Sequence, residues 1–214
     1  MIKALIFDLD SCLAAATEIG AAIVAPIFNA IREANQGDVP SADLEAAFTD
    51  CWRFPFDFVA EKYGFSSAMR TAGYRGFSQL EITQPLHGYG DLAVLEDLPG
   101  KLFLVTSGFR RLQASKVRAL GLTARFTDIL IDAIDAGPTQ GKRPIFETIL
   151  REHQLKPDEV LVVGDNPDSE IAAGNQLGIT TVQILRPGVP PADAATHRVR
   201  DLHELKALCA TRRA

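Results

Sequence analysis

The sequence contains few of the residues that build disulfide frameworks or zinc sites. It has three cysteines and four histidines in 214 residues. The cysteines Cys12, Cys51 and Cys209 are odd in number and widely spaced, which is typical of reduced thiols. The histidines show no metal-ligand spacing with one another or with cysteine. We therefore expect a cytoplasmic protein that depends on neither disulfides nor zinc.

Clusters of basic residues and long apolar segments are also missing. The formal net charge is -5 and there is no long basic run, whereas nucleic-acid binding relies on clustered Lys and Arg. The apolar start of the chain contains one basic side chain, Lys3, and is interrupted by Asp8. It therefore fits neither a secretion signal nor a membrane span. We expect no nucleic-acid partner and no membrane partner.

The composition that remains is that of a folded globular chain. Hydrophobic residues make up 47% and charged residues 23% of the sequence, which excludes a disordered chain. A length of 214 residues suits one domain with a substantial core and a modest insertion.

Short apolar segments predict the strands of a sheet that is buried on both faces. The clear segments are residues 2–7, 102–105 and 160–163, and weaker ones are residues 128–131 and 180–184. Amphipathic helices are expected at residues 110–120, 144–153, 169–177 and 202–208. The alternation of strands and helices predicts an α/β fold with a doubly wound, mostly parallel sheet.

One long segment interrupts this alternation directly after the first strand. Residues 14–90 predict several helices and no convincing strand, and prolines and glycines divide them. We expect residues 14–90 to form a small helical cap domain, inserted into a core domain of residues 1–13 and 91–214. The aromatic residues at 52–58 are expected to pack within the cap, with contact to a substrate as the alternative.

The first candidate motif is the pair Asp8 and Asp10, which follows the first predicted strand. Two carboxylates at this spacing can meet at one reacting centre, where one attacks and the other moves a proton. By itself the pair is also compatible with a surface segment that merely ends a strand.

Two further motifs follow along the chain. Thr106, Ser107 and Gly108 place hydroxyls and backbone amides after a predicted strand, where they could bind a phosphate oxygen or cap a helix. Lys142 precedes a predicted helix, and its charge could balance that of a carboxylate and a phosphate. A lone lysine is otherwise typical of a solvated surface.

The fourth motif follows the strand predicted at residues 160–163. Asp165 and Glu170 offer hard oxygen ligands for a small divalent ion. Asp168 competes with Glu170 as the second acid of this motif. We prefer Asp168 as the cap of the following helix.

In their order and positions the four motifs resemble those of the haloacid dehalogenase superfamily, and the resemblance spans the chain outside the predicted cap. It implies that Asp8 is a covalent nucleophile and that Asp10 is first an acid and then a base. The family usually has Gly and Thr where this sequence has Ser11 and Cys12. This departure affects the expected geometry of the turn after Asp10, because Gly adopts a positive φ more readily than Ser does.

The resemblance also implies a phosphate site and a Mg²⁺ site. The residues implied in phosphate binding are Thr106, Ser107 and Lys142. The residues implied in metal binding are Asp8, Asp10 through its main-chain carbonyl, Asp165 and Glu170. Glu170 is chosen because family members place the second acid four or five residues after the first.

The resemblance predicts a Mg²⁺-dependent phosphatase for a small phosphorylated metabolite that the sequence does not specify. A phosphomutase stays open as an alternative, since it uses the same aspartyl-phosphate. A 2-haloacid dehalogenase is less favoured because such enzymes lack a counterpart of Asp10. A non-catalytic receiver-like phosphoacceptor module is disfavoured because its acceptor follows a central strand later in the chain. The oligomeric state is left open.

Overall fold

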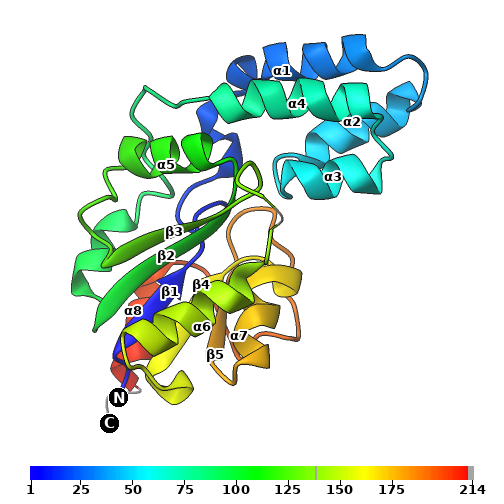
Figure 1. Ribbon diagram of the computed structural model, residues 1–214. Coiled ribbons are helices and arrows are strands. Elements are labelled where there is room, and N and C mark those ends of the chain that lie inside the picture. Colours follow the sequence, from blue (N-terminus) through cyan, green and yellow to red (C-terminus); the bar gives the residue numbers. More distant parts are fainter. Residues whose placement is uncertain (138, 212–214) are drawn as a thin grey trace.

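The computed structural model describes residues 1–137 and 139–211, and it contains a sheet of six parallel strands (Figure 1). The strands are β1 Ala4–Phe7, β2 Lys101–Gly108, β3 Asp128–Ala133, β4 Val160–Gly164, β5 Thr180–Ile184 and β6 His197–Val199. Their order is β3-β2-β1-β4-β5-β6. The predicted α/β fold class is confirmed, and the five predicted strands are present. The three-residue strand β6 was not predicted, because so short a segment carries no apolar pattern.

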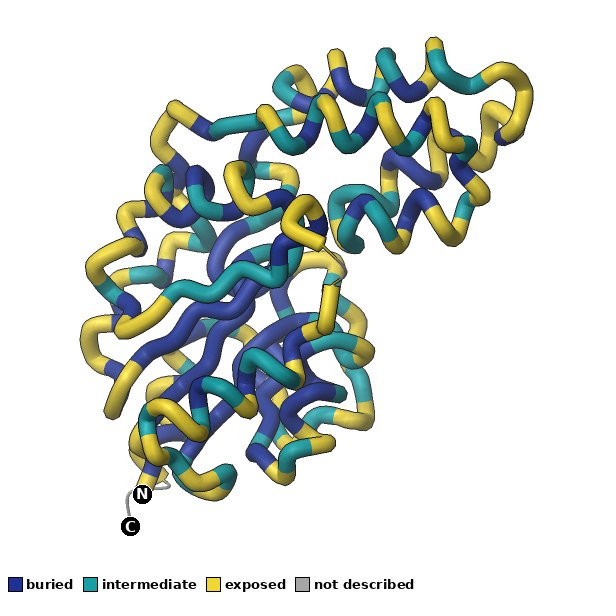
Figure 2. Tube along the Cα trace, in the orientation of Figure 1, coloured by how far each residue is buried: buried dark blue, intermediate teal, exposed yellow. Residues whose placement is uncertain are grey.

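Helices cover both faces of this sheet. They are α5 Arg110–Ala119, α6 Lys142–Glu152, α7 Ala172–Gln176 and α8 Leu202–Thr211. Alternate residues of β1 enter two separate apolar clusters, because successive side chains of a strand point to opposite faces. Leu5 and Phe7 share one cluster with residues of α5 and α8. Ala4 and Ile6 share the other with residues of α6 and α7. The central strands β1 and β4 are accordingly buried along their whole length, whereas the edge strands β3 and β6 are partly exposed (Figure 2).

Two helix boundaries differ from the prediction. Helix α6 begins at Lys142, two residues before the expected start, so this lysine lies in its first turn. The helix expected at residues 169–177 is divided into a π-helical turn, Pro167–Ile171, and the short α7. The side chain of Asn166 accepts a hydrogen bond from the Asp168 amide and caps this turn. The prediction that Asp168 is the cap was therefore wrong, since Asn166 already takes that position.

A second group of helices follows β1. It consists of α1 Ala21–Ala34, α2 Ser41–Asp50, α3 Phe56–Lys62 and α4 Ser67–Gln79. Figure 1 shows these four helices together beyond the carboxyl ends of the strands, with α1 and α4 side by side. We call these helices and the turns between them, residues 21–79, the helical group. The division into a core of residues 1–13 and 91–214 and a cap of residues 14–90 stays a prediction.

Short helical turns complete the chain. They are the 3-10 turns Ala16–Ile19, Leu92–Asp97 and Pro157–Glu159. Within the described residues, no helix combines the length and the apolar character needed to span a membrane.

A buried ion pair ties the loop after β1 to the rest of the sheet. The Arg186 guanidinium lies 2.8 Å from an Asp91 carboxylate oxygen and donates to the Cys12 carbonyl at 2.9 Å. The same Asp91 carboxylate accepts a hydrogen bond from the Leu202 amide at 2.9 Å. Both charged side chains are buried, and such a pair is costly to break because the remaining charge loses its partner. This network fixes the segment that follows Asp10.

Candidate active site

The candidate site lies where the order of the strands reverses, which is the usual ligand position in an open parallel sheet. β1 is in the middle, between β2 and β4, and all three end at the same edge. Asp8 directly follows β1, and Asp165 directly follows β4. The Asp8 amide donates to the Val163 carbonyl at 2.9 Å, which extends the pairing of the two strands to the site.

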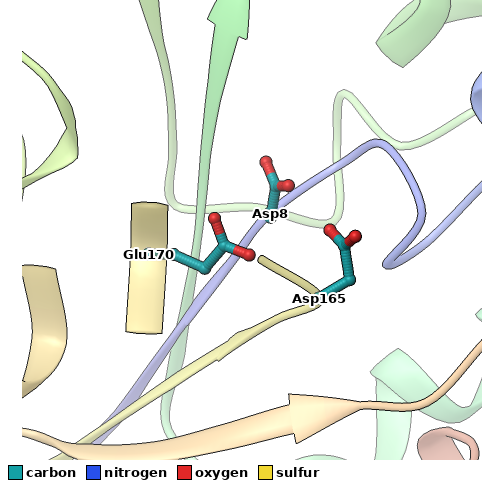
Figure 3. Close-up of side chains that lie close together, drawn as sticks. All are labelled: Asp8, Asp165 and Glu170. Carbon is teal, nitrogen blue, oxygen red and sulfur yellow. The ribbon is translucent and has the colours of Figure 1, made fainter. Parts of the chain in front are cut away.

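Three buried carboxylates meet at this edge. Oxygen atoms of Asp8, Asp165 and Glu170 lie within 4.8 Å of one another, and Figure 3 shows the three side chains gathered around one space. The Lys142 ammonium is 2.7 Å from an Asp8 oxygen and 2.8 Å from a Glu170 oxygen. Three carboxylates therefore face one ammonium, which leaves an excess of negative charge.

The pKa values reflect first the burial of these acids and then their mutual repulsion. Burial raises the pKa of Asp8 to about 7, and the Lys142 charge only partly offsets the rise. Burial, followed by the charges of Asp8 and Glu170, raises the pKa of Asp165 to about 8. Burial opposes the charge of Lys142, but Asp8 and Glu170 together raise its pKa above the usual value. A small divalent cation fits this donor set, because it would supply the missing positive charge to hard oxygen ligands.

Glu170 differs from the other two acids because both of its oxygens already have partners. One accepts a hydrogen bond from the Asn166 amide at 2.6 Å, and the other from Lys142 at 2.8 Å. A Cβ atom at position 164 would lie 2.3 Å from the Glu170 side chain, so Gly164 is needed for this close approach. Among the described residues, none donates a hydrogen bond to the Asp165 carboxylate. Asp165 is thus the acid that is available to a cation, while Glu170 organises the loop and Lys142.

Asp10 lies on a different part of the same pocket, where two residues of α5 contact it. Lys116 forms an ion pair with one oxygen of Asp10, and the Gln113 amide donates to the other at 3.0 Å. The same amide donates to the Thr106 hydroxyl at 2.7 Å and to the Ser107 carbonyl at 3.0 Å. Both Gln113 and Lys116 are buried. They connect the proposed acid to the proposed phosphate site.

Sequence reasoning missed Gln113 and Lys116. Their spacing of three places both side chains on the same side of α5, directly after the Thr106 motif. Two long polar residues on the side of an amphipathic helix that faces the sheet would have been a usable signal.

The structure brings all the predicted site residues into one pocket. These residues are Asp8, Asp10, Thr106, Ser107, Lys142, Asp165 and Glu170. Asp168 is exposed and lies outside this pocket. Thr106 is buried within β2, and Ser107 is half-buried beside it.

The turn after Asp10 shows the effect of the missing glycine. Ser11 has a φ of 57°, a left-handed conformation that costs a residue with a side chain more than it costs Gly. The Ser11 amide donates to the Ala14 carbonyl at 2.8 Å, so the turn is closed despite this cost. Serine in place of the usual glycine at position 11 therefore preserves the geometry of the turn but adds backbone strain.

Comparison with known proteins agrees with the fold and with the superfamily that the sequence resembles. Residues 2–178 match the model of a hydrolase family, the haloacid dehalogenase-like hydrolases. The match covers most of the chain, and the chain belongs to this family.

Curated relatives include enzymes with different substrates in their names. The chain is 33% identical over 134 residues to the pyrimidine 5'-nucleotidase YjjG of Escherichia coli (strain K12), covering 60% of this chain and 58% of that protein. It is 26% identical over 208 residues to a glyceraldehyde 3-phosphate phosphatase of Methanopyrus kandleri, covering 87% of this chain and 85% of that protein. The matches span less than two thirds of the length of YjjG and of the Bacillus subtilis protein YfnB.

Solved structures with the same fold include a putative hydrolase and a dehalogenase. The putative haloacid dehalogenase-family hydrolase YfnB of Bacillus subtilis, bound to magnesium, has a TM-score of 0.62 at 19% identity and covers 97% of this chain and 98% of that one. The L-2-haloacid dehalogenase of Xanthobacter autotrophicus has a TM-score of 0.61 at 17% identity, with coverages of 98% and 99%. Identities this low establish the shared fold only.

Proposed function

We propose that this hydrolase is a Mg²⁺-dependent phosphatase that cleaves small phosphomonoesters through an aspartyl-phosphate on Asp8. One observation carries the proposal. Buried Asp8 lies beside Lys142 and Asp165, while Asp10 is oriented by Lys116 and Gln113 on another part of the same pocket. A nucleophile and a separate proton carrier are the two groups that phosphoester cleavage through a covalent intermediate requires.

In the first step the Asp8 oxygen that is not paired with Lys142 attacks the phosphorus. The bond between phosphorus and the ester oxygen breaks, and Asp10 transfers a proton to the leaving oxygen. In the second step a water molecule attacks the same phosphorus while Asp10 accepts its proton. Inorganic phosphate leaves, and Asp8 is regenerated as a carboxylate.

Positive charge and hydrogen-bond donors would stabilise the phosphoryl group during both steps. Lys142, the Thr106 hydroxyl and Ser107 line the pocket beside Asp8. Asp8 and Asp165 would hold the Mg²⁺, together with the main-chain carbonyl of Asp10, and Glu170 would act mainly through Lys142 and the Asn166 loop. Bound Mg²⁺ would supply further positive charge against the phosphate oxygens.

The expected partner is a small phosphorylated metabolite, and we propose the cytoplasm as the location. None of the three cysteines, all of which are described, forms a disulfide. The odd number and wide spacing of the cysteines support the proposal of a reducing compartment. The proposal includes no nucleic-acid or membrane partner.

The test is product analysis of the purified protein with metal controlled. With 4-nitrophenyl phosphate we expect stoichiometric inorganic phosphate in the presence of Mg²⁺ and loss of activity in excess chelator. Undiminished turnover in chelator, with no metal found by elemental analysis, would contradict the metal assignment. Halide release from 2-chloropropionate would instead support a dehalogenase. Isomerised sugar phosphate without free phosphate would support a mutase.

A further inference from the structure

The pocket that contains the candidate site has a second wall, formed by the helical group. The pocket volume is about 180 Å³, and its lining extends from Asp8 to residues of α1, α3 and α4. The apolar lining from the helical group includes Val24, Phe28, Trp52, Phe54, Phe56 and Phe77. Among the lining residues between positions 16 and 79, all of which are described, only Arg53 carries a charge.

The apolar wall continues from the helical group to Phe109 of the sheet edge. Phe77 of α4 stacks on Phe109, with ring centroids 5.4 Å apart and an interplanar angle of 19°. Phe56 of α3 contacts the same ring at 6.2 Å. Phe109 follows β2 directly and lies three residues after Thr106. A group esterified to a phosphate at Thr106 would therefore lie against aromatic side chains.

The chemistry of this wall discriminates between substrates. When a sugar or polyol binds against this wall, several of its hydroxyls lose their hydrogen bonds to water and contact apolar side chains instead. Each hydroxyl that finds no new hydrogen-bond partner disfavours binding. A planar, weakly hydrated group loses little hydration and gains contacts with the aromatic rings. The wall thus favours a flat apolar group over a hydroxylated one.

Arg53 indicates that the substrate also carries a polar group. It lies in the turn between α2 and α3 and lines the same pocket as Asp165. Its side chain is exposed, and within the described part of the chain no carboxylate forms an ion pair with it. The Arg53 charge acts on Asp50 and Asp165 without forming an ion pair with either. A guanidinium in this position at the edge of an apolar pocket is suited to a carboxylate or carbonyl oxygen of a ligand.

We propose that the organic part of the substrate is a flat, weakly hydrated group, such as an aromatic ring, that carries an anionic or carbonyl oxygen within reach of Arg53. The phosphate end would occupy the Asp8 edge, the ring would lie against Phe77 and Phe109, and the additional oxygen would pair with Arg53. This inference rests on the proposed phosphatase function.

The first experiment compares kcat/KM for phosphate esters of primary alcohols of similar basicity. The probes are benzyl phosphate, 4-carboxybenzyl phosphate and glycerol 3-phosphate, with 4-nitrophenyl phosphate as the activity control. We expect benzyl phosphate to exceed glycerol 3-phosphate by at least about tenfold, with a further gain for the carboxylated ester. If glycerol 3-phosphate is as good as benzyl phosphate while 4-nitrophenyl phosphate is cleaved, the substrate class is wrong. If no ester releases phosphate, the proposed function fails and this inference fails with it.

The second experiment tests Arg53 with a matched control. Arg53→Met keeps the length of the side chain but removes its charge, and it should abolish the preference for 4-carboxybenzyl over benzyl phosphate. Arg75→Met is the control, because Arg75 is exposed on α4, lies outside the pocket and should keep the preference. An unchanged preference in Arg53→Met would contradict the role of Arg53. A loss in both variants would do the same, because the effect would not be local.

Discussion

The two walls of the pocket differ in how their side chains are partnered. At the sheet edge, Asp8, Lys142 and Glu170 form a connected buried cluster, and Asp10 is oriented by Lys116 and Gln113. On the helical group, the lining is mainly apolar and rich in aromatic side chains, and its single charged residue, Arg53, has no ion pair within the described residues. We expect the polar wall, whose side chains are held by ion pairs and hydrogen bonds, to carry out catalysis. We expect the apolar wall to determine which substrates bind.

The difference extends to how each wall is anchored. The sheet edge continues strands that are buried on both faces, and the Asp91–Arg186 pair fixes the loop behind it. The helical group packs mainly through its own aromatic side chains, with Phe56 and Phe77 also contacting Phe109 of the core. Substitutions at the edge should therefore change kcat for every substrate. Substitutions on the helical group should change the ranking of substrates.

The largest effect is expected for Asp8→Asn. An amide cannot form the covalent intermediate, so phosphate release should fall by at least about a thousandfold. Burial raises the pKa of Asp8 to about 7, which means that the folded state accommodates the charged carboxylate poorly. Charging Asp8 therefore lowers the free energy of unfolding at pH values above the pKa that Asp8 has in the unfolded chain. At pH 8 the uncharged variant should accordingly have a melting temperature no lower than that of the wild type. Substantial turnover with an intact circular dichroism spectrum would contradict the role of Asp8.

The next effect separates the two acids of the fourth motif. Asp165→Ala should strongly raise the Mg²⁺ concentration needed for half-maximal activity, because it removes an available oxygen ligand. Asp168→Ala is the matched control and should resemble the wild type, since Asp168 is exposed outside the pocket. Burial raises the pKa of Asp165 to about 8, so protons compete with the metal below that pH. The Mg²⁺ requirement of the wild type should therefore decrease as pH rises from about 6.5 to about 8.5.

If the order of the two alanine variants were reversed, the wrong acid would have been assigned. A Mg²⁺ requirement that is constant across this pH range would contradict the coupling of metal binding to Asp165.

A smaller effect is expected for Lys116→Met, which leaves the Asp10 carboxylate without its ion pair. Proton transfer by a poorly oriented acid should slow alkyl phosphates by about ten- to a hundredfold and activated aryl phosphates less. The ranking of benzyl over glycerol phosphate should be preserved, because Lys116 belongs to the sheet edge. Lys156→Met, at an exposed lysine outside the pocket, is the control. Equal slowing of alkyl and aryl esters would argue against a positioning role for Lys116.

The smallest effect concerns the strained turn at the sheet edge. Ser11→Gly removes the side chain from a residue with a φ of 57° and should stabilise the fold by up to about 1 kcal/mol. Ser78→Gly, in the last turn of α4, should destabilise instead, because glycine disfavours helix. Urea unfolding of both variants measures whether each substitution raises or lowers the free energy of unfolding. Destabilisation by Ser11→Gly would show that the serine side chain contributes more than its strain costs.

The sequence predicted the sheet edge better than its surroundings, for a physical reason. Asp8, Thr106 and Asp165 follow apolar segments, and parallel strands bring their carboxyl ends to one edge. The pairing of Lys116 with Asp10 spans 106 positions and depends on how α5 packs, which no local pattern specifies. The Asp91–Arg186 pair was missed for the same reason. The aromatic residues at 52–58 were expected to pack, with substrate contact as the alternative, and several of them line the pocket.

The central claim is that Asp8 carries the phosphoryl group and that Asp10 serves its release. It is tested most directly by rapid acid quenching of Asp10→Asn with 4-nitrophenyl phosphate, followed by mass analysis of the peptide that contains residue 8. We predict a burst of nitrophenolate, a phosphoryl group on Asp8 and slow further turnover, because water attack then lacks its base. Steady product release without any phosphoryl group on that peptide would contradict the account.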